Sequence, residues 1–167
     1  MTSYFSSLSF YKAGGGYAYL AAPKSVIPVI AQKGSEIVFL PQEETATGSI
    51  ALANRGNLLD MAEKTDMVVI GPGLSLHEET KQLVKELAAA IRKPLLIDGD
   101  GITALAEDLN IVRQRQAPTI LTPHLGEMAR LTGDDISRIT SHKIPVLQEA
   151  AGKLGAFLVM KGAHSLI

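Results

Sequence analysis

Short apolar runs alternate along the chain with longer stretches in which apolar residues recur at helical spacing. The six runs of strand length cover residues 17–22, 36–40, 67–70, 94–97, 119–121 and 156–160. Several are apolar at every position, which is typical of strands buried on both faces of a parallel sheet. The alternation of strands with helical stretches therefore predicts an α/β fold.

The clearest helical pattern covers residues 78–91, where apolar side chains repeat at the spacing of one helix face. Ser75 and Glu78 have the spacing of a capping box at the start of this helix. Six further helices are predicted at residues 3–13, 25–31, 52–64, 103–109, 125–132 and 145–154. Gly133 and Gly155 follow the last two and are expected to cap them.

Composition and charge narrow the possible functions. Of the 167 residues, 46% are hydrophobic and 20% are charged, as in a single soluble globular domain. The net charge of −1 gives no basic surface for nucleic acid, and no apolar run approaches the roughly 20 residues of a membrane span. The chain has no cysteine and no secretory signal at its start, so we expect a cytoplasmic protein with no nucleic-acid or membrane partner.

The two ends of the chain are less regular than its middle. The sequence opens almost directly in a predicted helix, and it closes at Ser165-Leu166-Ile167, which has the character of a strand that has just begun. We therefore expect residues 1–167 to form a single, partial domain.

Four polar turns directly follow predicted strands and contain most of the candidate chemistry. They are Gly71-Pro72-Gly73, Asp98-Gly99-Asp100, Thr122-Pro123-His124 with Glu127, and Lys161-Gly162-Ala163-His164. In an open parallel sheet, the loops at the carboxyl ends of the strands line the ligand crevice. We therefore expect carboxylate, imidazole and ammonium groups and glycine amides to converge on one site.

The first two turns each allow two interpretations. The glycines at positions 71 and 73 could bring a ligand close to the backbone and to helix-start amides, or they could form only a tight turn. Asp98 and Asp100 could hold Mg²⁺ at the mouth of the sheet. Asp100 could instead cap a helix that begins near Thr103.

The other two turns also allow more than one interpretation. His124 and Glu127 are three residues apart, so both side chains can face one side of a helical turn and could ligate a metal. Zinc is disfavoured because no third nitrogen or sulfur ligand is evident, and a glutamate in a first helical turn also interacts favourably with the helix dipole. Lys161 could contact a nucleotide phosphate, or it could be a solvated lysine at the end of a strand.

Four motifs follow one another in the second half of the chain. They are Gly-Pro-Gly-Leu at 71–74, Leu-Ile-Asp-Gly-Asp-Gly at 96–101, Leu-Thr-Pro-His-Leu-Gly-Glu-Met at 121–128 and Lys-Gly-Ala-His-Ser at 161–165. Together they resemble the motifs of the ADP/ATP-dependent NAD(P)H-hydrate dehydratases of the ribokinase-like superfamily, and the similarity covers essentially the whole chain. The resemblance implies a three-layer sandwich with a mostly parallel sheet and helices on both faces, here truncated.

The resemblance also implies a repair reaction on NADH or NADPH whose nicotinamide ring has been hydrated. The family phosphorylates the ring hydroxyl with ADP or ATP and then eliminates phosphate, which restores the double bond. By position, Gly73 and His124 resemble contacts to the hydrated dinucleotide, and Asp98 and Glu127 resemble acidic residues that organise Mg²⁺. The segment that resembles the adenine-nucleotide site is Lys161, Gly162, Ala163, His164 and Ser165.

The sequence departs from the family pattern at both ends. It lacks the N-terminal strand with its glycine- and alanine-rich turn, and it lacks the Gly-Ser/Thr-Gly-Asp segment that supplies the anion hole and the general-base aspartate. We therefore expect the base to lie beyond Ile167 and the chain to be inactive alone. For the parent protein we expect a homo-oligomer, and an epimerase domain fused to its N-terminus is compatible with the resemblance.

Two other functions remain open from the sequence. A ribokinase-like kinase of a hydroxymethylpyrimidine or a thiazole alcohol would share the sheet and the nucleotide loop, although the motif at 122–127 disfavours it. A non-catalytic dinucleotide-binding or assembly module would explain the missing base without truncation.

Overall fold

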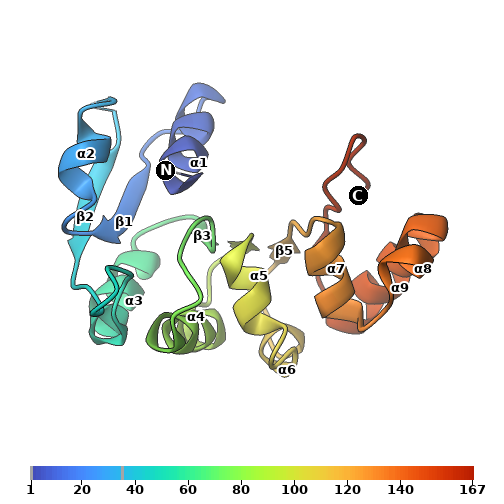
Figure 1. Cartoon of the computed structure of the whole chain (residues 1–167). Helices are drawn as coiled ribbons and strands as arrows, with labels where there is room; N and C mark the ends of the chain where they lie inside the picture. Colours follow the sequence, from blue (N-terminus) through green and yellow to red (C-terminus); the bar gives the residue numbers. More distant parts are fainter. Residues whose placement is uncertain (1, 35) are drawn as a thin grey trace.

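The computed structural model describes residues 2–34 and 36–167, and its succession of helices and strands confirms the α/β prediction (Figure 1). The helices are α1 (Thr2–Lys12), α2 (Ile27–Ala31), α3 (Arg55–Glu63), α4 (Glu78–Ala90), α5 (Asp100–Leu105), α6 (Asn110–Arg113), α7 (Leu125–Thr132), α8 (Ile136–Ser141) and α9 (Lys143–Leu154), with a 3₁₀ helix, η1 (Leu52–Asn54), before α3. The strands are β1 (Tyr19–Pro23), β2 (Val38–Gln42), β3 (Val68–Ile70), β4 (Leu95–Ile97), β5 (Thr119–Leu121) and β6 (Phe157–Leu158).

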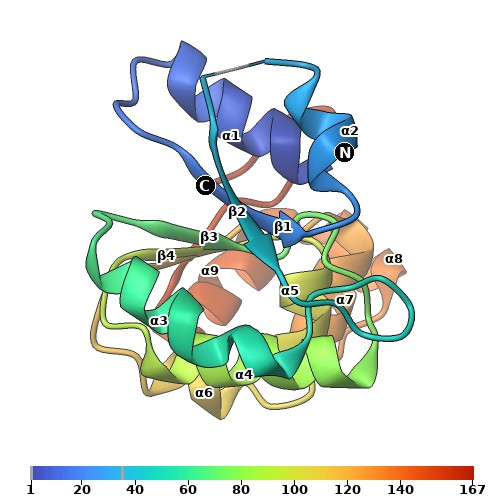
Figure 2. The ribbon, with the colours of Figure 1, turned by 90° about the vertical axis from the view of Figure 1, so that its left-hand side faces the viewer.

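The strands form two parallel sheets. β1 pairs with β2, whereas β3, β4, β5 and β6 pair in chain order. Parallel neighbours need a crossover connection, and each crossover of the larger sheet contains at least one helix. In both ribbon views, α4 and α6 lie on one side of the larger sheet, and α1, α2 and the smaller sheet lie on the other (Figure 2).

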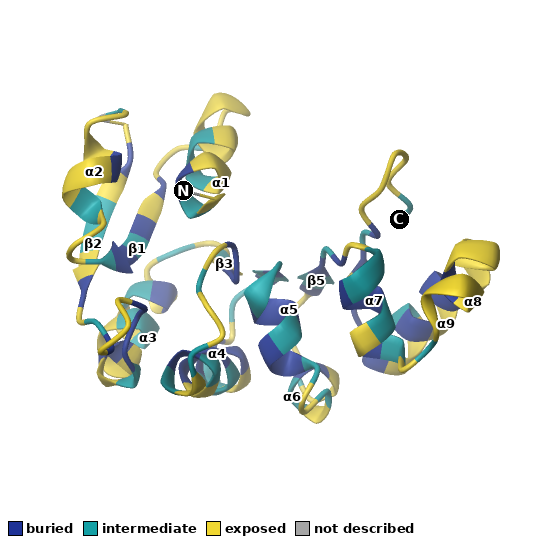
Figure 3. Ribbon diagram, in the orientation of Figure 1, coloured by how far each residue is buried: buried dark blue, intermediate teal, exposed yellow. Residues whose placement is uncertain are grey.

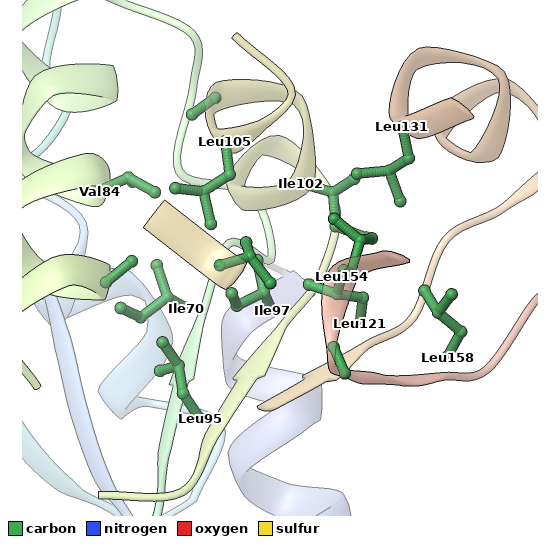
Figure 4. Packing of buried hydrophobic residues seen from close by; sticks show 14 of the residues in the cluster. Ile70, Val84, Leu95, Ile97, Ile102, Leu105, Leu121, Leu131, Leu154 and Leu158 are labelled. Carbon is green, nitrogen blue, oxygen red and sulfur yellow. The ribbon is translucent and has the colours of Figure 1, made fainter. Parts of the chain in front are cut away.

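The main hydrophobic core fills the space between the larger sheet and the helices of one side (Figure 4). Ile70, Ile97, Leu121 and Leu158 stand in register, one on each strand, and all four are buried. Helices α4, α5, α7 and α9 complete this core with the buried side chains of Val84, Leu87, Ile102, Leu105, Met128 and Leu154. Because each large aliphatic side chain contributes roughly 1.5–3 kcal/mol when buried, this core fixes the order of the strands and the position of their carboxyl ends.

A second row of apolar side chains crosses the opposite face of the larger sheet. Val69, Leu96, Ile120 and Phe157 are in register, and their positions alternate with those of the buried row. Val69 is 50% exposed and Phe157 is 64% exposed, while the two central residues are partly buried. The sequence predicts strands buried on both faces, but within the described residues this row stays partly open because the core-forming helices pack on the other face.

The smaller sheet has a core of its own. Leu20 and Ala22 of β1 pack with Tyr4 of α1, Ile30 of α2 and Ile37. The Tyr4 hydroxyl also donates a hydrogen bond to the backbone carbonyl of residue 33 at 2.9 Å. Buried residues therefore gather in two places, as Figure 3 shows in dark blue, and α8 and the turn near the C-terminus remain largely exposed.

Several predicted boundaries differ from the observed ones. The helix predicted at 103–109 begins earlier, at Asp100, and a separate helix, α6, follows because the Asp108 carboxylate accepts a hydrogen bond from the Asn110 amide at 3.1 Å. The strand predicted at 156–160 is shorter, because Met160 pairs with Leu166 in an isolated antiparallel bridge. Helix α8 was not expected, since its six residues are too few for a periodic pattern.

The capping box predicted before α4 is wrong. The residue that precedes this helix is His77, so Ser75 stands two positions too early to cap it. The Ser75 hydroxyl instead accepts a hydrogen bond from the His77 amide at 3.3 Å. The predicted glycine caps are confirmed, since Gly133 and Gly155 end α7 and α9 in the left-handed conformation. In the described ranges, every helix is too short or too polar to cross a membrane.

Candidate functional site

The loops at the carboxyl ends of β4, β5 and β6 bring four predicted site residues together, Asp98, His124, Glu127 and Lys161. The residue that follows each strand continues the backbone ladder: the amide of Thr122 donates to the carbonyl of Ile97 at 3.1 Å, and the amide of Val159 donates to the carbonyl of Leu121 at 2.8 Å. Two residues further on, the amide of Lys161 donates to the carbonyl of Pro123 at 2.8 Å. The Lys161 ammonium forms an ion pair with the Asp98 carboxylate and lies 4.0 Å from Glu127 Oε2. We call Asp98, Thr122, His124, Glu127 and Lys161 the strand-end cluster.

Asp98 is the most strongly engaged residue of this cluster. Its Oδ1 atom accepts a hydrogen bond from the Thr122 hydroxyl at 2.7 Å and another from the Lys161 ammonium. Burial acts to raise the pKa of Asp98, but the hydrogen bonds from Lys161 and Thr122 and the positive charge of Lys161 together outweigh it and lower that pKa. Asp98 is therefore a firmly ionised carboxylate in a partly buried position.

His124 and Glu127 form a capping box at the start of α7. The Nδ1 atom of His124 accepts hydrogen bonds from the amides of Gly126 at 3.0 Å and Glu127 at 3.2 Å, and Glu127 Oε2 accepts one from the His124 amide at 2.8 Å. Because Nδ1 is an acceptor, the ring proton lies on Nε2, which is 3.2 Å from Glu127 Oε1. The glutamate is buried beneath the helix start, whereas the imidazole is exposed.

The glycine turn after β3 lies beside the backbone of the Asp98 loop. Gly71 has a φ of +124°, and a Cβ atom there would lie 1.7 Å from the carbonyl oxygen of Asp98. Gly73 has a φ of +69°, but a Cβ atom there would meet only the side chain of Thr2, at 3.6 Å. Gly71 is thus required by loop packing, and Gly73 is the glycine with room for a ligand.

Asp100 does not cap a helix, so that interpretation of its role is wrong. Helix α5 begins at Asp100 itself, after Gly99, and has no side-chain cap. The Oδ2 atom of Asp100 accepts a hydrogen bond from the amide of Ser75 at 2.9 Å instead. This contact links the loop after β4 to the loop after β3.

The segment Lys161, Gly162, Ala163, His164 and Ser165 forms an exposed turn beyond β6. The turn closes through two backbone hydrogen bonds between Met160 and Leu166, at 2.9 and 3.1 Å. Lys161 is the member of this segment that joins the strand-end cluster, while the rest of the turn projects into solvent.

Within the strand-end cluster, one carboxylate is suited to bind Mg²⁺. No group of three or more His, Asp or Glu side chains able to hold a metal occurs in residues 2–34 and 36–167. Both carboxylate oxygens of Glu127 already face His124, and Asp98 is paired with Lys161. Magnesium is usually bound by one or two carboxylates with phosphate oxygens and water, so Asp98 fits this mode and Glu127 would have to leave its capping box first.

Two features of the site were not predicted from the sequence. His124 and Glu127 have capping-box spacing, but histidine is not among the usual capping residues, so the pair reads as a possible metal site. The hydrogen bond between Asp100 and Ser75 joins residues 25 positions apart, and such a contact has no local signal.

Comparison with solved structures places the chain in a known fold class. It superposes on a ribokinase-like superfamily protein from Enterococcus faecalis with a TM-score of 0.80 at 22% identity, covering 98% of this chain and 54% of that one. It superposes on the ADP/ATP-dependent NAD(P)H-hydrate dehydratase from Bacillus subtilis with a TM-score of 0.71 at 22% identity, covering 98% and 55%. The fold is therefore ribokinase-like.

Sequence comparison identifies the family. The family model described as NAD(P)H-hydrate dehydratase matches residues 2–167, and this chain belongs to that family. It is 47% identical over 161 residues to a bifunctional NAD(P)H-hydrate repair enzyme from Thermofilum pendens, covering 96% of this chain and 31% of the relative. It is 34% identical to an ADP-dependent (S)-NAD(P)H-hydrate dehydratase from Xanthomonas campestris, covering 93% of this chain and 52% of the relative. The chain thus spans 31% of the first relative and 52% of the second.

Proposed function

We propose that this chain forms part of an NAD(P)H-hydrate dehydratase, which uses ADP or ATP to restore NADH or NADPH from the hydrated form. The observation that carries the proposal is the strand-end cluster, where an ammonium, two carboxylates and an imidazole from three successive strand ends meet. Phosphoryl transfer depends mainly on positioning and on neutralising charge. Family membership and the names of the relatives support the choice of this reaction.

Lys161 and Asp98 would serve the nucleotide. The ammonium of Lys161 lies just beyond β6, where it can turn from Asp98 to a phosphate of the adenine nucleotide. The exposed residues Gly162, Ala163, His164 and Ser165 would contact the rest of that nucleotide. The Asp98 carboxylate would then be free to hold Mg²⁺, with Glu127 nearby as a further acidic group. When bound, Mg²⁺ would neutralise the phosphate charge that opposes transfer.

Gly73 and His124 would face the hydrated dinucleotide. Gly73 is exposed and leaves space above its Cα atom. The His124 ring is exposed, and the amides of α7 fix its orientation through Nδ1. A ring held in this way can contact the hydrated nicotinamide ring without first losing rotational freedom.

For the parent protein we also propose a domain organisation and an oligomeric state. The T. pendens relative is named as a bifunctional enzyme, which supports a second domain in the parent protein. We propose that this second domain is an epimerase and that the parent is a cytoplasmic homo-oligomer. No Gly-Ser/Thr-Gly-Asp segment occurs in these 167 residues, so we expect binding but no turnover from this chain alone.

Calorimetry with variants that respect the capping role of His124 tests the proposal. His124→Asn keeps an oxygen that can accept from the α7 amides but removes the imidazole. We expect it to weaken binding of hydrated NADPH roughly tenfold and to leave the affinity for Mg²⁺ and ADP unchanged. Lys161→Met should weaken the binding of Mg²⁺ and ADP and leave the affinity for hydrated NADPH unchanged. Lys153→Met, which removes a lysine paired with Glu149, is the matched control.

The outcomes separate the candidate functions. Equal losses of both ligands in the His124 variant would indicate a folding role for this residue and contradict its place in the substrate site. Binding of a hydroxymethylpyrimidine with no binding of hydrated NADPH would favour the kinase instead. A wild-type chain that binds neither nucleotide would refute the proposed function.

A further inference from the structure

The loop between β3 and α4 holds an unusual concentration of left-handed backbone. Gly71, Gly73 and Ser75 have φ values of +124°, +69° and +79°. Ser75 is the one non-glycine residue with positive φ in residues 2–34 and 36–167. A side chain disfavours this conformation, so it persists only where surrounding contacts hold it.

Asp100 supplies the contact that holds Ser75 from outside the loop. Its Oδ2 atom accepts the hydrogen bond from the Ser75 amide at 2.9 Å. The remaining hydrogen bonds of the loop are local: the Leu74 amide donates to the Gly71 carbonyl at 3.3 Å, and the His77 amide donates to the Ser75 hydroxyl at 3.3 Å. The Asp100 carboxylate is therefore the side chain that ties this loop to the start of α5.

The tie is reinforced by the backbone on the other side of Gly71. The amide of Asp98 donates to the carbonyl of Ile70 at 3.0 Å, and a Cβ atom on Gly101 would lie 3.0 Å from the Cα atom of Gly71. Gly73 thus lies between two fixed points, a backbone contact at Gly71 and a carboxylate contact at Ser75. Its position follows from both.

Asp100 is separate from the strand-end cluster. The carboxylate of Asp98 faces Lys161 and Thr122, whereas that of Asp100 faces the glycine loop. Helix α5 receives no side-chain cap from Asp100. The two aspartates of one short motif therefore have different partners.

We propose that Asp100 is a positioning residue that clamps the amide of Ser75 and thereby holds Gly73 in place for the dinucleotide. The inference rests on the proposed function for the identity of the ligand. The clamp itself is a property of the free chain. The carboxylate acts through the loop and touches no reacting atom.

Hydrogen exchange and NADPH binding, both measured on the full 167-residue chain, test this role. Asp100→Ala should accelerate exchange of the Ser75 amide roughly tenfold or more, because a hydrogen bond to a charged group is lost. Asp100→Asn keeps an acceptor oxygen and should restore most of the protection. Asp108→Ala is the matched control, since Asp108 also accepts a backbone hydrogen bond, from Asn110, outside this loop.

Binding of NADPH, followed by its fluorescence, connects the clamp to the site. We expect Asp100→Ala to weaken NADPH binding roughly tenfold and to leave ADP binding unchanged, and Asp100→Asn to restore the affinity. Adding Ser75→Gly to Asp100→Ala should also recover part of the affinity, because glycine adopts positive φ without strain. A purely structural aspartate would lower both affinities together.

Three further results would overturn the proposal. Unchanged exchange at Ser75 in Asp100→Ala would show that no clamp exists. Faster exchange with unchanged NADPH affinity would show that the clamp does not serve the site, and the proposed function would stand. A wild-type chain that fails to bind NADPH would refute the proposed function together with the role of the clamp in it, whatever the exchange rates show.

Discussion

Replacing Lys161 with methionine tests how much the ion pair with Asp98 stabilises the fold. The variant keeps the apolar stem but leaves Asp98, whose side chain is only 23% exposed, with the hydroxyl of Thr122. A hydrogen bond to a charged group contributes about 1.5–3 kcal/mol, whereas an exposed ion pair contributes about 0.2–1 kcal/mol because water screens it. Since Lys161 is 41% exposed, we expect an intermediate loss of about 1–1.5 kcal/mol at pH 7 and a fall in Tm of roughly 2–6 °C.

The same pair predicts a pH dependence with a definite sign. Burial favours the neutral form of Asp98, but Lys161 and Thr122 outweigh it, so the pKa of Asp98 is lower in the folded chain than in the unfolded chain. The unfolded state therefore binds the proton more readily, and stability rises with pH in this range. The contribution is complete above the ordinary value of about 4 and is lost as the pH falls through the lower pKa of the folded state.

Urea unfolding followed by circular dichroism measures both effects. The stability difference between the wild type and Lys161→Met should be largest near pH 7 and should shrink at acid pH, as Asp98 becomes protonated. Lys153→Met is the control, because Lys153 pairs with Glu149 on the surface of α9. Equal stability of Lys161→Met and the wild type at pH 7 would refute the reasoning, and so would a loss that persists unchanged in acid.

Two further substitutions probe the scaffold of the site. Arg115→Met should lower the free energy of unfolding by about 2–4 kcal/mol in urea titrations, because the guanidinium donates to a threonine hydroxyl and to three carbonyls in the last turn of α4 and just beyond it. Arg113→Met, which removes a single surface hydrogen bond to Asn110, should cost less than about 0.5 kcal/mol. Gly71→Ala should lower the free energy of unfolding by more than about 3 kcal/mol, because its methyl group would collide with the Asp98 carbonyl. Gly133→Ala also places a side chain at positive φ but in open space, so it should lower the free energy of unfolding by only about 1–2 kcal/mol. Equal effects within either pair would contradict the structure.

The sequence predicts the sheet and its strand ends well because both depend on short-range patterns. Runs such as 94–97 and 119–121 are buried strands in the structure, since continuous apolar residues have few other places to lie. The polar residues after them follow the parallel ladder, so the meeting of Asp98 with Lys161 at one edge follows from topology.

The partners of individual side chains could not be predicted in the same way. The local sequence favours a solvated lysine at position 161, with a phosphate contact as the alternative, and the separation of 63 residues from Asp98 gives no local signal of the ion pair. His124 reads as a ligand, although its Nδ1 atom is used by the backbone amides of α7. Such choices are made by tertiary geometry, where several acceptors compete for one donor, and the roles of these residues toward ligands stay predictions.

The exposed apolar row from Val69 to Phe157 changes the thermodynamics expected of this chain. The heat capacity change of unfolding reflects the apolar surface that becomes hydrated, and it is usually about 12–15 cal/mol/K per residue. Water already reaches Val69 and Phe157 in the folded chain, so unfolding adds less new hydration there. The stability of the chain by itself should therefore vary more gently with temperature than that of a domain whose central sheet is enclosed on both faces.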